Sequence, residues 1–246
     1  MMSLSFQKYF DKVFLRNKLP INSIPFWINK CLDRKCRNII QIGSNDGSKG
    51  DPLHKLILKR KKWEVLFVEP VPYLFDRLIK NYPNENRFSF EKLAINEGKT
   101  ETFYYVDSKA KEDITDLPFW YDQLGSFNRS NIVNHLEGRL EPYIKEIEIK
   151  GTSLEELFKK NNIEKLDLLH IDTEGYDWKI LKQLDIGKYH PTIILFEHKH
   201  LSEAENIDSV KFVDTRYHIL KFASDYLCIK KEVMQQKDME FVNNLI

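Results

Sequence analysis

The sequence predicts an α/β domain in which helices cover both faces of a mostly parallel sheet. Short apolar runs alternate with longer segments of helical periodicity, and glycines and prolines separate the two kinds of segment. Several runs are apolar throughout, which is typical of strands that are buried on both faces. The chain has 246 residues, of which 42% are apolar and 30% charged, and this fits one well-filled domain with a modest appendage.

Seven short runs are the candidate strands. They are residues 38–42, 64–68, 88–95, 166–171, 192–196, 217–222 and 226–229. Two crossover helices are expected early in the chain, because residues 52–62 and the segment after Glu69 each place apolar side chains on one face. Residues 101–150 break the alternation: residues 103–106 resemble a strand, and a polar, aromatic stretch follows. Such an insertion commonly carries substrate contacts.

The first 37 residues have the character of a helical appendage. Their apolar side chains recur at helical spacing, at Phe6, Tyr9, Phe10, Val13 and Phe14. This helix is expected to pack on the domain or on a second copy of the chain, giving a homodimer, and a lid or membrane-surface contact is the alternative. The expected organisation is therefore an appendage over residues 1–37 and one domain over residues 38–246.

Charge, cysteine content and hydropathy disfavour several classes of protein. Lys and Arg number 38 and Asp and Glu 37, so the chain has no strong field to attract nucleic acid, and no such partner is expected. Cys31, Cys36 and Cys228 include no Cys-x-x-Cys pair, which predicts reduced thiols. No apolar run approaches the roughly 20 residues of a membrane span, and no signal peptide is evident, so a cytoplasmic protein is expected.

The first candidate strand runs into a loop that is typical of a ligand site. Gly43 and Gly47 lie between this strand and a helix, where glycines let the backbone approach a ligand closely. Glu69 ends the second candidate strand, where its carboxylate can accept hydrogen bonds from both hydroxyls of a ribose. The loop and the acid together predict a nucleotide cofactor.

Asp46 decides between two such cofactors. A dinucleotide needs a Gly-x-Gly-x-x-Gly turn without anions, because its pyrophosphate lies at the helix N-terminus. This loop has a different glycine spacing, and Asp46 would repel pyrophosphate but suit the ammonium and sulfonium groups of S-adenosylmethionine. S-adenosylmethionine is therefore the expected cofactor. In the alternative interpretation, Gly43 and Gly47 make a tight turn and Asp46 caps a helix.

Carboxylates and histidines follow two later candidate strands. Asp172 and Glu174 come after one, and Glu197 and His198 come after the next. Because strand carboxyl ends form the ligand edge of such sheets, Asp172 and Glu174 are expected to face one cleft as catalytic residues. Methylation of a hydroxyl requires removal of its proton, and His198 is the best candidate base because imidazole titrates near neutral pH. Asp172 would orient the hydroxyl or share the proton.

Two other interpretations concern the same residues. A structural role is the alternative for His198, and His170, within an apolar strand, is expected to be structural. Asp172, Glu197 and His198 could also gather a divalent cation. A hard cation such as Mg²⁺ prefers oxygen ligands, and this set supplies only two carboxylates with an imidazole, so a metal is not favoured.

Four short motifs occur in order along the chain: IGSNDG at residues 42–47, FVEP at 67–70, LAIN at 93–96 and HIDTEG at 170–175. Together they resemble the FkbM family of S-adenosylmethionine-dependent methyltransferases over about residues 38–200. The resemblance implies a Rossmann-like class I methyltransferase sheet of seven strands, the last antiparallel, and O-methylation of sugars, polyketides or related metabolites. A sugar, glycan or small molecule is the expected acceptor, for which the aromatic residues Phe119, Trp120, Tyr121 and Phe127 are candidate contacts. A non-catalytic binding protein and an NAD-dependent oxidoreductase are the alternatives.

The resemblance also implies positions for the cofactor. Its methionine part would meet Gly43, Ser44, Asn45, Asp46 and Gly47, its ribose Glu69 and Pro70, and its adenine the neighbourhood of Ala94, Ile95 and Asn96. The segment Gly125-Ser126-Phe127 matches a family loop near cofactor and acceptor, and Asp172 is expected to meet both. The chain departs from the family at Asp177, where a glutamate is common, so that the charge is kept but its reach is shorter.

Overall fold

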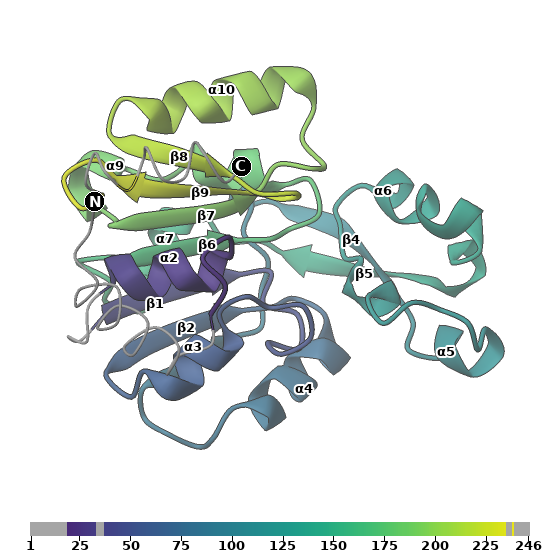
Figure 1. Cartoon of the computed structure of the whole chain (residues 1–246). Coiled ribbons are helices and arrows are strands. Elements are labelled where there is room, and N and C mark those ends of the chain that lie inside the picture. Colours follow the sequence, from purple (N-terminus) through teal and green to yellow (C-terminus); the bar gives the residue numbers. More distant parts are fainter. Residues whose placement is uncertain (1–18, 33–36, 235–237, 239–246) are drawn as a thin grey trace.

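The computed structural model describes residues 19–32, 37–234 and 238, which include one seven-stranded sheet (Figure 1). The strands lie in the order β3-β2-β1-β6-β7-β9-β8. Their bounds are β1 Arg37–Ile42, β2 Trp63–Val68, β3 Phe88–Glu91, β6 Leu168–Ile171, β7 Ile193–Glu197, β8 Tyr217–Lys221 and β9 Asp225–Lys230. β9 pairs antiparallel with β7 and β8, and the other neighbouring strands are parallel. The prediction of a mostly parallel sheet with an antiparallel final strand is confirmed.

The register of the sheet brings four strand ends to one edge. Ile42 pairs with Val68 on one side and with Ile171 on the other, and Ile171 pairs with Phe196. The polar residues that follow β1, β2, β6 and β7 therefore emerge beside one another. This is the edge at which parallel sheets of this kind bind their ligands.

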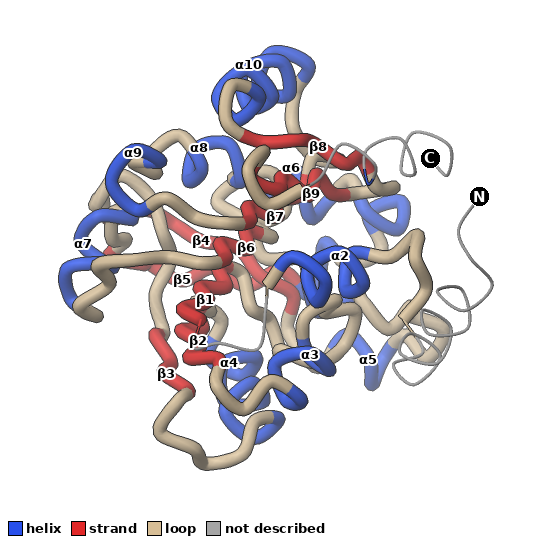
Figure 2. The backbone as a smooth tube through the Cα atoms, turned by 60° about the vertical axis from the view of Figure 1, so that its left-hand side comes forward, coloured by secondary structure: helices blue, strands red, loops and turns tan. Residues whose placement is uncertain are grey.

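Helices cover both faces of the sheet (Figure 2). One face carries α2 Ile24–Cys31, α3 His54–Lys59 and α4 Pro72–Asn81, and the other carries α7 Leu154–Lys160, α8 Asp177–Leu181, α9 Ile186–Tyr189 and α10 Glu203–Asp214. Successive side chains of a strand point to opposite faces. Ile39 of β1 accordingly belongs to the first of two large apolar clusters, and Ile40 belongs to the second.

Helix α2 is built into the first cluster. Trp27 and Ile28 are 2% and 0% exposed, and they share this cluster with Ile39 and Trp63 of the sheet. Residues 24–32, expected as part of an appendage, therefore contribute to the core of the domain. The amphipathic segment from Phe6 to Phe14, with its expected homodimer contact, lies outside the described residues.

An insertion between β3 and α7 projects from the sheet (Figure 1). Its base is the antiparallel pair β4 Thr100–Val106 and β5 Ile144–Lys150. The chain between them forms α5 Ala110–Asp113, η1 Tyr121–Gln123, α6 Arg129–Val133, η2 His135–Gly138 and η3 Glu141–Tyr143. A separate apolar cluster, which includes Val106, Leu124 and Leu140, stabilises this segment. The predicted strand at residues 103–106 is confirmed, whereas β5 was not predicted.

Two predicted elements end earlier in the structure than in the sequence interpretation. The strand expected at residues 88–95 ends at Glu91, and Ile95 makes only an isolated bridge to Thr152. The helix expected at residues 52–62 spans His54–Lys59, because the chain already enters β2 at Trp63. The early end of β3 leaves the residues before Ile95 available for the ligand edge.

Cys31 and Cys228 are free thiols, and Cys36 is outside the described residues. Burial raises the pKa of the Cys228 thiol, which keeps it protonated and unreactive. Over residues 19–32, 37–234 and 238, the helices are too short or too polar to cross a bilayer.

Candidate active site

The main pocket lies between the ligand edge of the sheet and the insertion. It contains about 540 Å³ of space between protein atoms, part of which is open to solvent. Its lining comes from the strand ends (Gly43, Asn45, Glu69, Pro70, Asp172, Glu174), from the chain after β3 (Leu93, Ala94, Ile95) and from the insertion (Phe103, Gln123, Gly125, Phe127). Asp172 and Glu174 both line this pocket, as expected from their position after one strand, and Ala94 and Ile95 line it as well.

The two glycines of the β1 loop have different tasks. Gly43 has φ +76°, and a Cβ there would collide with the carbonyl oxygen of Asp172, so only glycine lets the loops after β1 and β6 touch. Gly47 has φ +67°, and a Cβ there would collide with Leu78 and Tyr82 of the α4 region. Gly47 therefore permits helix packing and does not line the pocket, in contrast to the sequence expectation.

Glu69 is buried at the end of β2 and faces the main pocket. One carboxylate oxygen accepts the N–H of Asn45 at 2.8 Å, and the other accepts the N–H of Val71 at 2.9 Å. Burial raises the pKa of this carboxyl group to about 7. Each carboxylate oxygen has a second lone pair, so Glu69 can still accept a pair of ligand hydroxyls.

The predicted adenine neighbourhood is only partly in the pocket. Ala94 and Ile95 line it together with Phe103 and Phe127 from the insertion. Asn96 is fully buried and does not line it, because its side-chain oxygen accepts the N–H groups of residues 98 and 99 and its amide donates to the carbonyl of Lys99. This part of the lining is therefore apolar.

Ser126 also lies beside the pocket rather than in its lining. Its hydroxyl accepts the N–H of Asn128 at 3.1 Å and the side-chain amide of Asn131 at 3.2 Å. Its neighbours Gly125 and Phe127 supply the lining instead. Ser126 thus shapes the loop that the sequence resemblance placed near the cofactor.

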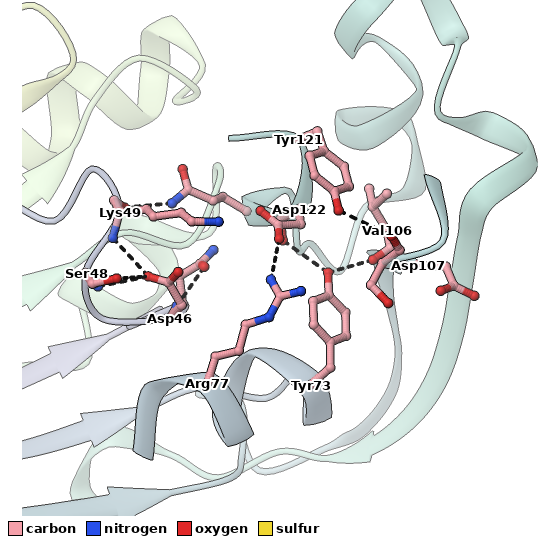
Figure 3. Close-up of polar contacts among 12 residues, drawn as sticks. Asp46, Ser48, Lys49, Tyr73, Arg77, Val106, Asp107, Tyr121 and Asp122 are labelled. Carbon is pink, nitrogen blue, oxygen red and sulfur yellow. Dashed lines mark hydrogen bonds and ion pairs between the residues drawn. The ribbon is translucent and has the colours of Figure 1, made fainter. Parts of the chain in front are cut away.

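Asp46 lines neither the main pocket nor the second, more polar pocket described below. Its carboxylate accepts three hydrogen bonds of 2.9 Å, from the N–H and hydroxyl of Ser48 and from the N–H of Lys49 (Figure 3). Asp46 therefore stabilises the turn after β1 and does not cap the next helix, α3, which begins at His54.

A second, more polar pocket adjoins the first and shares Gly43, Asn45, Asp172 and Glu174 with it. Ser44, Gln41, Asp51 and His170 also line it. Among the described residues, three side-chain atoms of this lining are buried without a hydrogen-bond partner: Gln41 Oε1, Asp51 Oδ2 and His170 Nδ1. Buried polar atoms are almost always paired, so their convergence indicates a polar ligand.

Asp51 is the acid that the sequence interpretation missed. It lies four residues beyond Gly47 and directly before a proline, and its position before a helix was the available signal. Burial raises the pKa of its carboxyl group to about 6. His170, expected to be structural, is 2% exposed, and burial lowers the pKa of its imidazole to about 4, which keeps the ring neutral.

Asp177 connects the two acidic loops. Its carboxylate accepts the N–H and hydroxyl of Thr173 at 3.2 and 2.9 Å, and the N–H of Glu197 at 3.1 Å. Asp177, although its side chain is shorter than the glutamate common in the family, therefore fixes the loop after β6 against the end of β7.

Burial and the neighbouring carboxylate of Glu174 raise the pKa of Asp172 well above its ordinary value.

His198 does not line either pocket. Its Nε2 lies 3.1 Å from the carbonyl oxygen of Phe222, and its ring packs on Tyr226 with centroids 4.3 Å apart. The structure therefore does not gather the candidate metal set of Asp172, Glu197 and His198. His200, two residues further on, lies beside the pocket instead, with its Nε2 3.3 Å from Glu174 Oε2.

The insertion is held over the pocket by polar contacts with α4 and the β1 loop (Figure 3). Arg77 of α4 pairs with Asp122 at 2.6 Å, and the hydroxyl of Tyr73 donates to the carbonyl of Val106 at 2.7 Å. The side-chain amide of Gln123 donates to the carbonyl of Lys49 at 2.8 Å. These contacts fix η1 next to the loops that line both pockets.

The strand order of the sheet and its antiparallel β9 are those of the class I methyltransferase fold. The family model described as the methyltransferase FkbM domain matches residues 41–226, so the chain belongs to the FkbM methyltransferase family.

Among solved structures, one in the fibrillarin/Nop5p complex has 10% identity and a TM-score of 0.41, covering 81% of this chain and 74% of that chain. The Methanococcus jannaschii fibrillarin pre-rRNA processing protein has 10% identity and a TM-score of 0.42, covering 81% and 69%. A comparison with curated proteins finds no match.

Proposed function

We propose that the protein transfers a methyl group from S-adenosylmethionine to a hydroxyl oxygen of a sugar, glycan or other small metabolite. One observation carries the proposal: Glu69, the acid expected to bind the ribose diol, lines the same cavity as Asp172 and Glu174. Family membership supports methyl transfer. The acids at the edge support oxygen as the acceptor, because a carboxylate there can accept a hydroxyl proton.

The residues present fit the cofactor part by part. The apolar part of the pocket lining at Ala94 and Phe127 suits adenine, and the carboxylate of Glu69 suits the two hydroxyls of the ribose. The unpaired Asp51 oxygen and Gln41 carbonyl of the second pocket fit the donors of an ammonium group. When bound, S-adenosylmethionine supplies an electrophilic methyl group on a positively charged sulfur.

The chain's own residues would align and activate the acceptor. Asp172 lines both pockets, so it is placed at their junction, where it would take the proton of the acceptor hydroxyl. Glu174 would orient the acceptor at the same junction. Asp177 keeps both loops in place through its bonds to Thr173 and the Glu197 amide, and alignment of reacting atoms is a large part of catalysis.

The acceptor side carries aromatic residues. The ring of Trp120 lies 5.7 Å from that of His135, whose ring lies 5.5 Å from that of His200. Phe127, one of the aromatic residues expected to meet a sugar ring, lines the main pocket with the acids, whereas Phe119 is 64% exposed. The flat faces of these rings suit the apolar face of a sugar.

Calorimetric titration with S-adenosylhomocysteine and with NAD tests the cofactor, and we expect binding only of the first. Transfer of tritium from labelled cofactor to a panel of glycans and small alcohols tests the reaction. The same panel with amine and thiol acceptors is the control for oxygen. Cofactor binding without transfer to any acceptor would favour the binding-only alternative, and transfer to nitrogen alone would contradict O-methylation.

A further inference from the structure

We propose that His135, Glu174 and His200 form a binding site for a divalent transition-metal ion of the zinc type at the mouth of the main pocket. The three residues come from different parts of the chain, namely η2 of the insertion and the loops after β6 and β7. One ligand atom from each lies within 4.8 Å of the other two. Folding therefore assembles a site that sequence spacing does not reveal.

The geometry of the central pair matches that of two metal ligands. Glu174 Oε2 and His200 Nε2 are 3.3 Å apart. A tetrahedral zinc ion with bonds of about 2.0–2.1 Å holds neighbouring ligand atoms about 3.3 Å apart. His135 is the more distant member. It is only partly buried, so rotation of its side chain can bring the imidazole to the same point.

Glu197 supplies an independent observation. Its Oε1 lies 3.8 Å from His200 Nε2, and its Oε2 is buried with no hydrogen-bond partner among the described residues. An unpaired carboxylate oxygen next to an imidazole is costly unless a cation or a donor lies close to it. Glu197 is not one of the three clustered residues, so we assign it a supporting role beside His200.

The backbone around the site is held in position. The side-chain amide of Asn131 donates to the carbonyl oxygen of Glu174 at 2.9 Å, which ties α6 to the loop after β6. Glu174 itself has φ +51°, and Leu136 and Glu137, directly after His135, have φ +51° and +56°. Such conformations are costly for these residues and persist where surrounding structure enforces them.

The donor set indicates the kind of ion. Two imidazoles with one carboxylate leave open coordination positions, as in catalytic zinc sites and two-histidine iron sites. Mg²⁺ and Ca²⁺ prefer oxygen ligands and would bind poorly. If the proposed function holds, the ion would be available to bind acceptor oxygens, because Glu174 lines the main pocket together with Asp172.

The test is a calorimetric titration of the chelator-treated full chain with Zn²⁺ and, separately, Mg²⁺. We expect one Zn²⁺ per chain, no measurable Mg²⁺ binding, and a loss of Zn²⁺ affinity of at least about tenfold in His135→Ala and His200→Ala. His218→Ala, a histidine of β8 away from the cluster, is the matched control and should bind like the wild type. Anomalous diffraction at the zinc edge should place the ion against the three side chains.

Circular dichroism and S-adenosylhomocysteine binding would show that each variant is folded. Unchanged Zn²⁺ affinity in both variants, or an anomalous peak elsewhere, would overturn the metal site. These readouts do not depend on methyl transfer. Zinc binding without methyl transfer would count against the proposed function alone, and methyl transfer without zinc binding would count against this site alone.

Discussion

Gly43 and Asp172 touch across the two central strands, with the α-carbon of the glycine so close to the carbonyl of the aspartate that no side chain fits between them. This contact joins the cofactor loop after β1 to the proposed catalytic loop after β6. The geometry of one loop is therefore fixed by the other.

Gly43→Ala should destabilise the fold through this contact. Gly98→Ala is a matched control, because Gly98 has φ +77° against +76° at Gly43 but its nearest neighbour, Glu156 Oε2, is 3.7 Å from the added Cβ. We expect Gly98→Ala to cost about 1–2 kcal/mol from the left-handed backbone alone. Gly43→Ala should cost about 1–3 kcal/mol more from the clash, as measured by urea unfolding. Equal losses would show that the contact is not tight.

Glu69→Ala should weaken cofactor binding by about tenfold to a hundredfold, the effect of losing hydrogen bonds to a charged group. Calorimetry with S-adenosylhomocysteine measures this. Glu91→Ala is the control, because Glu91 ends the neighbouring strand β3 in register with Val68 but does not line the pocket. A comparable loss of affinity in Glu91→Ala would contradict the assignment of the ribose acid.

Glu69 should also make the stability of the cofactor-free protein depend on pH. Burial raises its pKa from 4.5 to about 7, so between these values the folded chain holds a proton that the unfolded chain has released. The stabilisation of the folded state by this proton, about 3 kcal/mol in total, is fully present below pH 4.5 and is lost as the pH rises through about 7. The difference in unfolding free energy between wild type and Glu69→Gln should follow this slope from pH 5 to 8. A flat difference would show that the carboxyl is not perturbed.

The pair of Arg77 and Asp122 should stabilise the docking of the insertion on α4. Asp122 is 4% exposed but Arg77 is 39% exposed, so solvent screening limits the coupling to about 1 kcal/mol in a double-mutant cycle. Arg129 and Glu141, which are 45% and 53% exposed, are the control pair and should couple by less than about 0.5 kcal/mol. Equal coupling in both pairs would indicate that Asp122 makes no special contribution.

Asp172→Asn should lower turnover by roughly 10²–10⁴-fold while S-adenosylhomocysteine affinity stays within a few fold, because the side chain acts on the acceptor. His198→Ala is the informative comparison. Its ring lies within hydrogen-bond distance of the carbonyl of Phe222, outside the pockets. We therefore expect His198→Ala to lower the unfolding temperature and to leave the turnover rate close to that of the wild type. A strong rate loss only in His198→Ala would restore the histidine as the base.

The sheet and much of its ligand edge were predictable from local patterns of residues along the chain. Apolar runs such as residues 39–42 and 65–68 are buried because both faces are covered, and their own composition reveals this. Glu69 and Asp172 follow such runs directly, so their place at the strand ends was predictable. β5 was missed because its isoleucines, at 144, 147 and 149, keep no regular spacing and lie among charged residues within a long insertion.

Tertiary structure decided which polar side chains of each loop face the pockets. The direction of a side chain in the loop after a strand depends on how that loop turns and on the contacts that the loop makes with other segments. Asp46 turns into its own loop while Asp51 enters the polar pocket, and His198 turns to Phe222 while His200 meets Glu174. Local periodicity carries no information about these choices, because they depend on how each loop turns and, for the two histidines, on partners that are far away in the chain.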